Sequence, residues 1–365
     1  MRVATLATRF STGGAELNSL LVANELRLRG FQAESWFLMR EGDLEIPEGH
    51  TARVASEHAS RGPVNIIRSV RRSFQFASEF KPDVIIGFQP LANIIGAMSA
   101  RRLGACKFIG TQRNPSFSQG KWTGRIESAL GATRLYSLNI AVTAAVAETY
   151  GHYSASYREK IRVVHNGAPP LANFDGSKDC ARSHLGLPRD VALVGTIGRL
   201  ADQKNPLFLI ECCRDLDDVH LVFAGGGPLR AELAELAKTY GISHRVHFTG
   251  QLRGVEISAF YKAIDIFLLP SNYEGFGRTL VEAMSLGTPV VANELRVTNE
   301  VVSDAGILLP LEKKRWQQAI ACLLADKALK QKFASIGPSQ AATFSIKNMI
   351  DGYENACKQV LGPRT

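Results

Sequence analysis

A single segment of the chain, residues 265–292, contains a complete strand–loop–helix–strand unit. The apolar run at 265–269 predicts a buried strand, the apolar residues at 283–286 follow a helical spacing, and residues 289–292 begin another strand. This order of elements is typical of a parallel sheet. Because ligands of an open α/β sheet bind at the carboxyl ends of its strands, the loop at 271–277 is predicted to line a ligand site.

Two glycines and two glutamates mark this loop and the helix after it. Gly275 and Gly277 let the backbone approach a ligand closely, and the helix start offers unpaired N–H groups to an anion. Glu274 stands just before that anion site, and Glu282 follows about two helical turns later. Carboxylates beside a phosphate site are suited to accept hydrogen bonds from hydroxyls, which favours a polyhydroxylated phosphate ester as ligand. The alternative is an acid that favours the helix start, followed by a solvated glutamate.

The length and the composition predict a soluble protein with two domains. The chain has 365 residues, 45% of them hydrophobic and 21% charged. No apolar run approaches the roughly 20 residues that a membrane-spanning helix needs. The first residues favour a strand over a signal peptide. The six cysteines lack metal-like spacing, so we expect reduced thiols in a cytoplasmic protein.

Strand-like apolar runs alternate with helical segments along the whole chain, which predicts two doubly wound α/β domains. In the first half, strands are expected at 2–7, 33–39, 83–88, 106–111, 139–143 and 161–165, and helices at 15–29, 64–80, 91–103 and 122–135. In the second half, strands are expected at 191–197, 219–224, 246–249, 265–269, 289–292 and 306–309, and helices from 207 and at 297–302, 312–326, 328–336 and 345–361.

A run rich in proline, glycine and polar residues at 169–177 predicts a linker between the domains. The expected organisation is a first domain at 1–168, this linker, a second domain at 178–344 and a terminal helical segment at 345–365.

Two cations follow the first strand of the second domain. Arg199 and Lys204 lie on one loop, where the arginine fork and the compact lysine ammonium can converge on a diphosphate. The alternative is that both are solvated. The next strand runs into a glycine-rich turn at 225–228. Because Arg230 stands where a dinucleotide fingerprint needs Gly or Ala, this turn does not indicate an NAD site.

Loops of the first domain carry further candidates. Gly13 and Gly14 open a helix and can bring backbone N–H groups to a phosphate, although a plain helix cap fits as well. Arg113 and Asn114 follow a strand, which makes them candidate contacts to a second substrate. The alternative for these two residues is a turn begun by Asn-Pro.

The run from Glu274 to Glu282, Glu-Gly-Phe-Gly-Arg-Thr-Leu-Val-Glu, resembles the Glu-x7-Glu signature of the family 4 retaining glycosyltransferases. The Gly-Arg-x4-Lys-Asn run that contains Arg199 and Lys204 is similar to the same family, whose members include bacterial surface-polysaccharide and lipid-linked glycan transferases. The resemblance covers the second domain strongly and the first mainly through the order of its elements. It implies the α/β GT-B fold, in which two doubly wound Rossmann-like parallel-sheet domains face each other across a cleft.

The resemblance also implies roles for individual residues. Arg199 and Lys204 would clamp the leaving diphosphate, Glu274 would hold sugar hydroxyls, and Glu282 would hold the ribose. Catalytic roles are thus implied for Arg199, Lys204 and Glu274. The implied donor-binding residues are Gly13, Gly14, Arg199, Lys204, Glu274, Gly275, Phe276, Gly277 and Glu282.

The first domain departs from the family pattern. Many members carry a histidine near the reacting sugar, but the corresponding run at 87–93 contains none, so Gln89 or Asn93 would take its place. Arg113 and Asn114 match only part of a family run that has an acid where Gln112 stands. Gln89, Arg113 and Asn114 are therefore the expected acceptor-side residues.

The positive charge is concentrated in the first half of the chain. Residues 1–166 contain 21 Lys and Arg against 13 Asp and Glu, whereas residues 167–365 contain 22 against 21. An anionic partner such as acidic lipid headgroups or a lipid diphosphate would be attracted. The segment at 64–80 predicts a basic amphipathic helix for a membrane surface, or an ordinary helix with a solvated basic face. No basic run is interleaved with aromatic residues, which disfavours nucleic acid as partner.

These observations and the resemblance predict a metal-independent glycosyltransferase of hexosyl type that acts in cell-surface polysaccharide biosynthesis. The resemblance implies that the reaction retains the anomeric configuration. The expected partners are a nucleotide-diphosphate sugar as co-substrate and a glycan or lipid-linked acceptor, with no cofactor. The expected location is the cytoplasm, with peripheral contact to the inner face of the cell membrane. The alternative is a non-catalytic sugar-nucleotide or glycan-binding protein of the same fold.

Overall fold

The computed structural model describes residues 1–11, 13–58 and 62–362. The end of the predicted terminal segment, residues 363–365, lies outside the described residues. Among the described helices, none is both long and apolar enough to cross a membrane.

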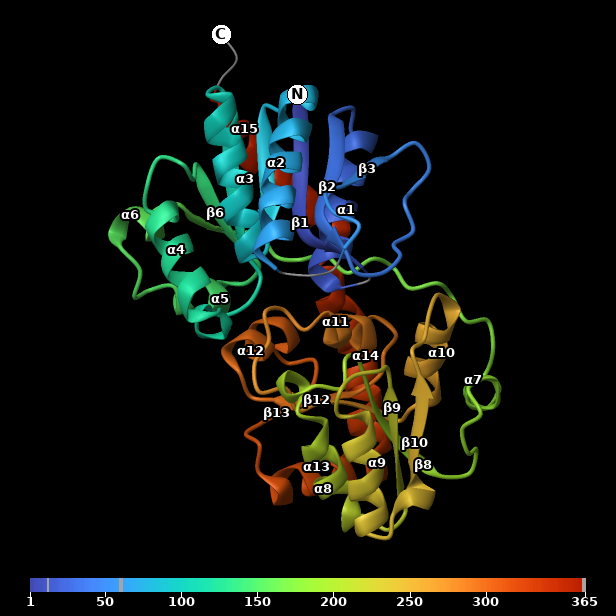
Figure 1. Ribbon diagram of the computed structural model, residues 1–365. Coiled ribbons are helices and arrows are strands. Elements are labelled where there is room, and N and C mark those ends of the chain that lie inside the picture. The colour runs from blue at the N-terminus through green and yellow to red at the C-terminus, as the bar shows by residue number, and fades with distance from the viewer. Residues whose placement is uncertain (12, 59–61, 363–365) are drawn as a thin grey trace. The chain divides into compact units, whose positions relative to one another are not determined.

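The chain forms two compact units, each built on one parallel sheet (Figure 1). Met1–His165 and Lys347–Thr365 form the first unit, and Asn166–Ile346 forms the second. The doubly wound α/β fold predicted from the sequence is confirmed in both.

The sheet of the first unit has seven strands in the order β3-β2-β1-β4-β5-β6-β7. Its strands are β1 (Arg2–Phe10), β2 (Gln32–Arg40), β3 (Thr51–Val54), β4 (Val84–Phe88), β5 (Lys107–Gln112), β6 (Leu138–Ala141) and β7 (Ile161–Val163). All five residues of β4 are buried, as expected for a strand covered on both faces. The edge strand β3 was not predicted, because its four residues carry no clear apolar alternation.

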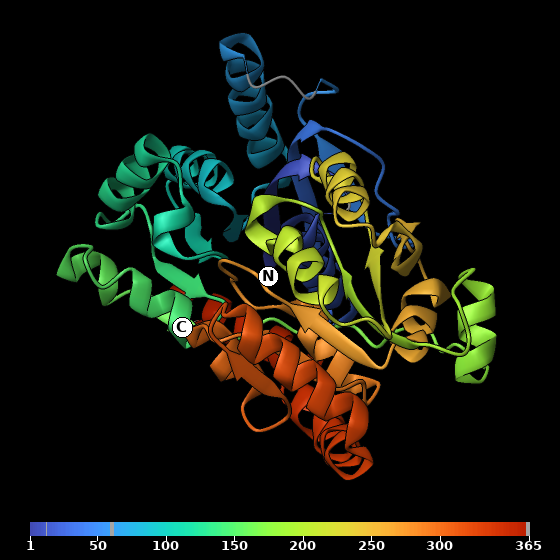
Figure 2. The same ribbon diagram turned by 90° about the horizontal axis from the view of Figure 1, so that it is seen from below.

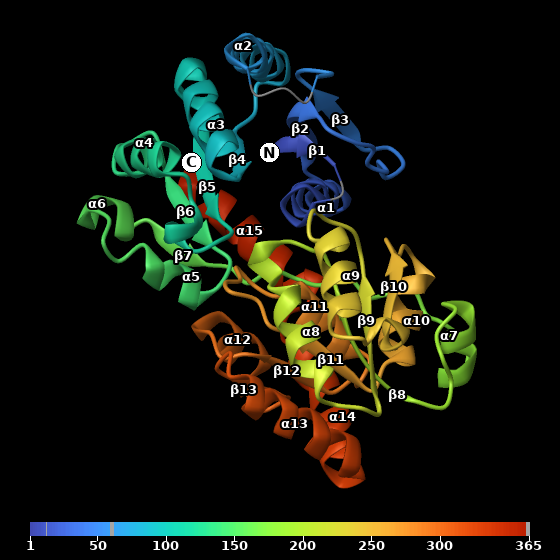
Figure 3. The same ribbon diagram turned by 60° about the horizontal axis from the view of Figure 1, so that its bottom comes forward.

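Helices cover both faces of this sheet (Figure 3). Helices α2, α3 and α4 lie side by side on one face, and α1 and α15 lie on the other. The helices of this unit are α1 (Gly14–Leu28), α2 (Pro63–Phe80), α3 (Pro90–Leu103), the short 3-10 helix η1 (Ser116–Ser118), α4 (Lys121–Gly131), α5 (Ala144–Thr149), α6 (Ala155–Arg158) and α15 (Ile346–Leu361).

The last helix, α15, packs within the first unit. Arg29 of α1 forms ion pairs with Asp351 at 2.6 Å and with Glu354 at 2.8 Å. The ring of Tyr353 stacks on that of Phe88 in β4, with the centroids 5.9 Å apart.

The sheet of the second unit has six strands in the order β10-β9-β8-β11-β12-β13. Its strands are β8 (Ala192–Ile197), β9 (Val219–Ala224), β10 (Val246–Gly250), β11 (Ile266–Leu269), β12 (Val290–Asn293) and β13 (Ile307–Leu309). Its helices are α7 (Lys178–His184), η2 (Asp202–Lys204), α8 (Pro206–Arg214), α9 (Arg230–Thr239), η3 (Ser243–Arg245), α10 (Val255–Ala263), α11 (Arg278–Ser285), α12 (Arg296–Val302), α13 (Lys313–Ala325) and α14 (Lys327–Ala342). Figure 2 shows α7 beside α10 in this unit.

Two predicted helix ends are wrong. The helix expected at 122–135 ends at Gly131, against which the Tyr157 ring packs so closely that a Cβ would lie 2.3 Å from it. The helix expected to end at 336 continues to Ala342, through Pro338. A Cβ on Gly337 would lie 2.8 Å from the carbonyl oxygen of Met284, so this glycine lets α14 pack closely on α11. That packing offsets the cost of a proline inside the helix.

In both sheets the winding direction reverses at one place. In the first sheet the reversal falls between β1 and β4, and in the second between β8 and β11. The crevice outside the carboxyl ends of such a strand pair is where doubly wound proteins bind ligands.

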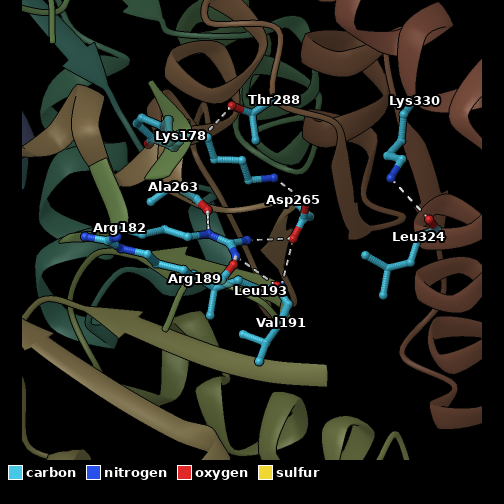
Figure 4. Close-up of polar contacts among 11 residues, drawn as sticks. Lys178, Arg182, Arg189, Val191, Leu193, Ala263, Asp265, Thr288, Leu324 and Lys330 are labelled. Carbon is cyan, nitrogen blue, oxygen red and sulfur yellow. Dashed lines mark hydrogen bonds and ion pairs between the residues drawn. The ribbon is translucent and has the colours of Figure 1, made fainter. Parts of the chain in front are cut away.

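Arg182 joins α7 to the amino ends of the central strands β8 and β11, opposite the carboxyl ends where the crevice lies (Figure 4). Its guanidinium donates to the carbonyl oxygens of Ala263 and Val191, both at 2.9 Å, and to Asp265 at 3.0 Å. The Arg182 side chain is only 4% exposed. Asp265 also accepts a hydrogen bond from Lys178 and one from the backbone N–H of Leu193 at 2.8 Å. A buried charge is thereby paired at the starts of β8 and β11.

Replacing Arg182 with alanine should lower the free energy of unfolding of the second unit by about 3 kcal/mol or more, because Asp265 loses its buried cationic partner and three carbonyl oxygens, of Ala263, Arg189 and Val191, lose a donor. Arg189→Ala is the matched control, since that side chain is exposed and, among the described residues, hydrogen-bonds only to Ser183. Calorimetric unfolding of both variants measures the difference. Equal stability of the two would contradict the role given to Arg182.

Candidate functional site

The two loops at the winding reversal of the second sheet carry most of the predicted site. The loop after β8 contains Arg199 and leads into η2, which ends at Lys204. The loop after β11 contains Glu274 and leads into α11. The fold thus brings residues that are 70 positions apart in sequence to one edge of the sheet.

An ion pair joins the two loops. The Lys204 ammonium lies 2.5 Å from Oε1 of Glu274, and the side chains are 24% and 6% exposed. The hydroxyl of Ser271 donates to the same carboxylate oxygen at 2.6 Å. Ser271 is held in turn by the amide of Asn293, which donates to its carbonyl oxygen at 2.8 Å. The carboxylate of Glu274 is therefore fixed from two sides.

Backbone contacts hold the loops together. The N–H of Asn272 donates to the carbonyl oxygen of Gln203 at 2.8 Å, and the Asn272 amide donates to the carbonyl oxygen of Asp202 at 2.7 Å. Lys204 and Glu274 are thus placed by their own loops as well as by their charges.

Arg199 differs from Lys204 in its surroundings. It is exposed, and within residues 1–11, 13–58 and 62–362 it forms no ion pair. Its guanidinium is therefore available to an anion without the loss of a protein partner.

The glycine-rich turn after β9 packs directly against the Arg199 loop. A Cβ on Gly225 would lie 2.0 Å from the carbonyl oxygen of Gly198, and one on Gly227 would lie 2.3 Å from that of Leu200. Both glycines have positive φ angles, of 126° and 159°. The turn is a tight packing element beside the cation loop.

The loop after Glu274 leads into α11 through a residue with a left-handed backbone conformation. Gly277, with φ 80°, is the residue before the first turn of the helix. Phe276 is buried, and its ring meets that of Phe344 edge-on with the centroids 5.3 Å apart. Gly275 is buried between Glu274 and Phe276. The side chain of Phe276 therefore anchors the loop, and the backbone is the part that can meet a ligand.

Glu282 lies on the buried face of α11, and both of its carboxylate oxygens have protein partners. Arg278, one turn earlier, lies 2.9 Å from Oε1, and the hydroxyl of Tyr261 donates to Oε2 at 2.9 Å. Burial and the adjacent Glu282 raise the pKa of Tyr261 well above its ordinary value, so its hydroxyl remains a donor. A ligand hydroxyl would use the lone pairs of Glu282 that remain.

In the first unit, the winding reversal brings Gln89 and Glu16 together. The Gln89 amide donates to Glu16 at 2.9 Å and accepts from the N–H of Thr8 at 3.2 Å. Gln89 has φ 98°, a strained conformation for a residue other than glycine. The Glu16 carboxylate folds back over Gly13 at the start of α1. A phosphate bound at Gly13 and Gly14 would therefore meet this carboxylate.

Arg113 and Asn114 also lie in the first unit, after β5. The Arg113 guanidinium lies over the Phe88 ring, 5.4 Å from its centroid. Asn114 is exposed, and its carbonyl oxygen accepts a hydrogen bond from Tyr150 at 3.2 Å.

A buried acid lies behind this loop. Asn93, which sequence reasoning offered as a substitute for the missing histidine, donates to Glu127 of α4 at 2.6 Å. The Gln112 amide donates to the same oxygen at 2.6 Å and also to the hydroxyl of Tyr157 at 2.9 Å. The other oxygen of Glu127 has no hydrogen-bond partner within the part of the chain that the structure describes. Burial raises the pKa of Glu127, which favours the protonated acid.

Sequence reasoning missed the residues that hold the predicted ones. Tyr261 and Ser271 have no motif, and their roles follow only from tertiary contacts. Arg278 was detectable, because it stands four positions before Glu282 and this spacing places the two on one helix face. Glu16 was detectable from its position in the first turn of the helix opened by Gly13.

Two family profiles match the sequence. The profile described as glycosyl transferases group 1 matches residues 177–340, and the profile described as glycosyltransferase family 4 matches residues 12–170. The two matches together span most of the chain.

The sequence is also similar to individual glycosyltransferases. It is 26% identical to the lipopolysaccharide core biosynthesis glycosyltransferase LpsE of Rhizobium meliloti, over 93% of this chain and 94% of that protein. It is 38% identical to D-inositol 3-phosphate glycosyltransferase of Mycolicibacterium smegmatis over 141 residues. That match covers 37% of this chain and only 32% of the relative.

Solved structures share the fold over nearly the full length. The complex of Anabaena HepE with UDP and glucose superimposes with a TM-score of 0.84 at 22% identity, covering 97% of this chain and 98% of that one. WaaG, described as a glycosyltransferase involved in lipopolysaccharide biosynthesis, gives a TM-score of 0.76 at 17% identity, covering 99% and 100%.

The contacts of Glu127 lead to a prediction about pH. A carboxyl group whose pKa is raised by folding contributes stability that is present below its unfolded pKa, near 4.5, and that is lost as the pH rises through the folded value. Glu127→Gln keeps a neutral acceptor, so it should be at least as stable as the wild type at pH 8 and lose this pH dependence. Glu127→Ala should be less stable by about 2 kcal/mol, because Asn93 and Gln112 lose their acceptor. Urea denaturation across the pH range tests this, and equal destabilisation by both changes at pH 8 would contradict it.

Proposed function

Because the chain belongs to the family 4 glycosyltransferases and has the GT-B fold, we propose that it transfers a sugar from a nucleoside-diphosphate sugar to a glycan or lipid-linked acceptor. The observation that carries this proposal is the Lys204–Glu274 pair at the winding reversal of the second sheet. Arg199, on the same loop as Lys204, forms no ion pair with any residue that the structure describes.

Cleavage of the donor releases a nucleoside diphosphate, so negative charge grows on the leaving group. Arg199 and Lys204 would stabilise this charge, and N–H groups at the start of α11 would assist them. Because the Lys204 ammonium is already paired with the Glu274 carboxylate, a bound diphosphate would share this ammonium with Glu274. Arg199 has no such carboxylate partner among the described residues, so its positive charge would act on the diphosphate alone.

The two glutamates would recognise hydroxyl groups. Glu274, fixed by Lys204 and Ser271, would accept from the transferred sugar. Glu282, held by Arg278 and Tyr261, would accept from the ribose. Their protein partners limit the orientations in which either carboxylate can act, which favours one placement of the donor.

Further features of the reaction belong to the same proposal. The sugar would be a hexose transferred with retention of configuration, and a phosphate oxygen of the donor would take the acceptor proton. The protein cations would take the place of a metal ion. On the acceptor side, Gln89, Arg113 and Asn114 are the proposed contacts.

The similarity to LpsE supports a role in cell-surface polysaccharide or lipopolysaccharide assembly. Such a role would place the chain in the cytoplasm, at the inner face of the membrane. The basic helix α2 supports peripheral contact there, since Val64 and Ile67 are 70% and 53% exposed beside the exposed Arg68 and Arg71.

The nucleotide base of the donor is open to a direct screen. Thermal-shift measurements against UDP-, GDP- and ADP-sugars should show one class that raises Tm by several degrees, because a ligand that binds only the folded protein stabilises it. The same class should support transfer of a labelled sugar. Stabilisation without transfer or hydrolysis would favour the non-catalytic alternative.

Arg199→Ala and Glu282→Ala should each lower the transfer rate by about 10²-fold or more. The loss for Arg199 follows from the charge that builds on the leaving group, and that for Glu282 from lost placement of the donor. Arg189→Ala is the matched control, since that exposed arginine lies in the same unit but before β8, whereas both loops follow the carboxyl ends of their strands. Initial rates at limiting donor, with folding checked by circular dichroism, measure the effect. Near wild-type rates in either variant would contradict the donor-site assignment.

A further inference from the structure

Helix α4 buries an acid and exposes two large apolar side chains. The buried acid is Glu127, and Leu130 packs partly on the core, whereas Trp122 and Ile126 face solvent. Trp122 is 75% exposed and Ile126 is 48% exposed, and the two are one helical turn apart. The stability of the first unit does not account for this pattern, because burying these two apolar side chains would stabilise the folded state more than exposing them.

The segment just before α4 extends the exposed apolar surface. Phe117, in η1, is 70% exposed. Lys121 and Arg125 are exposed on α4 between the apolar residues, and the Arg125 guanidinium lies over the Trp122 ring, 5.5 Å from its centroid. Aromatic, aliphatic and cationic groups therefore alternate on one surface.

Positive charge predominates in the part of the chain around this surface. Residues 84–148 contain seven Lys and Arg and two acids, the buried Glu127 and the exposed Glu148 of α5. An exposed patch in this part of the chain therefore has more cations than carboxylates.

A groove of about 500 Å³ opens beside the patch. Lys121 and Arg125 line it together with Gln119, Ser128 and His152. The groove offers hydrogen-bond donors and two cations to a group the size of a phosphate ester.

We propose that Phe117, Lys121, Trp122, Arg125 and Ile126, which we call the α4 anchor, dock on an anionic lipid surface. The occupant follows from charge complementarity and from the side chains present. Tryptophan and phenylalanine with flanking cations are suited to the boundary between headgroups and acyl chains. Lys121 and Arg125 would meet lipid phosphates, and the groove would accommodate a headgroup.

The buried side of α4 gives the anchor a fixed position in the first unit. Glu127 is held by Asn93 and Gln112, and Gly131 packs under the Tyr157 ring. These contacts orient Trp122 and Ile126 outward without any contribution from the lipid. The anchor is separate from the basic face of α2 and does not depend on the proposed transfer reaction.

Tryptophan fluorescence reports on the α4 anchor alone. The sequence contains three tryptophans, and Trp36 and Trp316 are fully buried, so only Trp122 can meet a lipid. The full-length chain is mixed with phosphatidylcholine vesicles that contain or lack phosphatidylglycerol, with brominated acyl chains as quencher. We expect quenching and a blue shift with the anionic vesicles only, both weakened by salt. Trp122→Phe should remove both signals.

Sedimentation with the same vesicles tests the cations. Lys121→Glu combined with Arg125→Glu should weaken binding at least about ten-fold, since each basic residue near an anionic surface adds to the attraction. The matched control is Lys314→Glu, which reverses the charge of an exposed lysine in the second unit. Leu28→Ala controls for loss of an exposed apolar residue from the first unit, in comparison with Trp122→Ala.

Two outcomes would overturn the proposal. The first is absence of Trp122 quenching at vesicle concentrations that sediment the protein, which would assign binding to another surface such as α2. The second is equal binding to neutral and anionic vesicles. Circular dichroism of each variant separates these results from loss of folding, and transfer activity with a soluble acceptor tests the proposed function independently.

Discussion

The ion pair between Lys204 and Glu274 joins the loops after the two strands at which the second sheet reverses its winding. Each partner also has contacts of its own loop, so neither depends on the pair alone. Ser271 and Asn293 fix the glutamate, and α11 begins directly behind it. The pair and the backbone contacts of Asn272 together hold the cation loop close to the helix that carries Glu282. A ligand that bridges a diphosphate and a set of hydroxyl groups fits this arrangement.

The first unit uses the same topological position with different chemistry. Gln89 and Glu16 meet at its winding reversal, where the second unit has a cation and an acid. Gln89 holds a strained backbone angle there, which is typical of functional positions. No lysine or arginine balances Glu16 within 4 Å among the described ion pairs. The two units thus share a fold. The cations proposed to bind the donor diphosphate, however, lie in the second unit.

The sequence predicted the fold class well, because apolar strands covered on both faces, such as β4 and β11, are continuous apolar runs. It also placed Lys204 and Glu274 in one site, since both follow strands of the same sheet. It did not predict that Glu282 shares its carboxylate with Tyr261, because that contact joins two helices. The buried acid and the exposed tryptophan of α4 escaped prediction for a related reason. Whether Trp122 or Glu127 faces the core is decided by the buried amides of Asn93 and Gln112, not by the helix itself.

The proposed function requires the loops that carry Lys204 and Glu274 to hold the diphosphate of a nucleotide donor. A crystal structure of the full chain with the nucleoside diphosphate that stabilises it best would show where the diphosphate lies. We expect diphosphate oxygens within hydrogen-bond distance of both Arg199 and Lys204, with the ribose hydroxyls at Glu282. A diphosphate bound elsewhere on the second sheet, with Lys204 still paired only to Glu274, would contradict it.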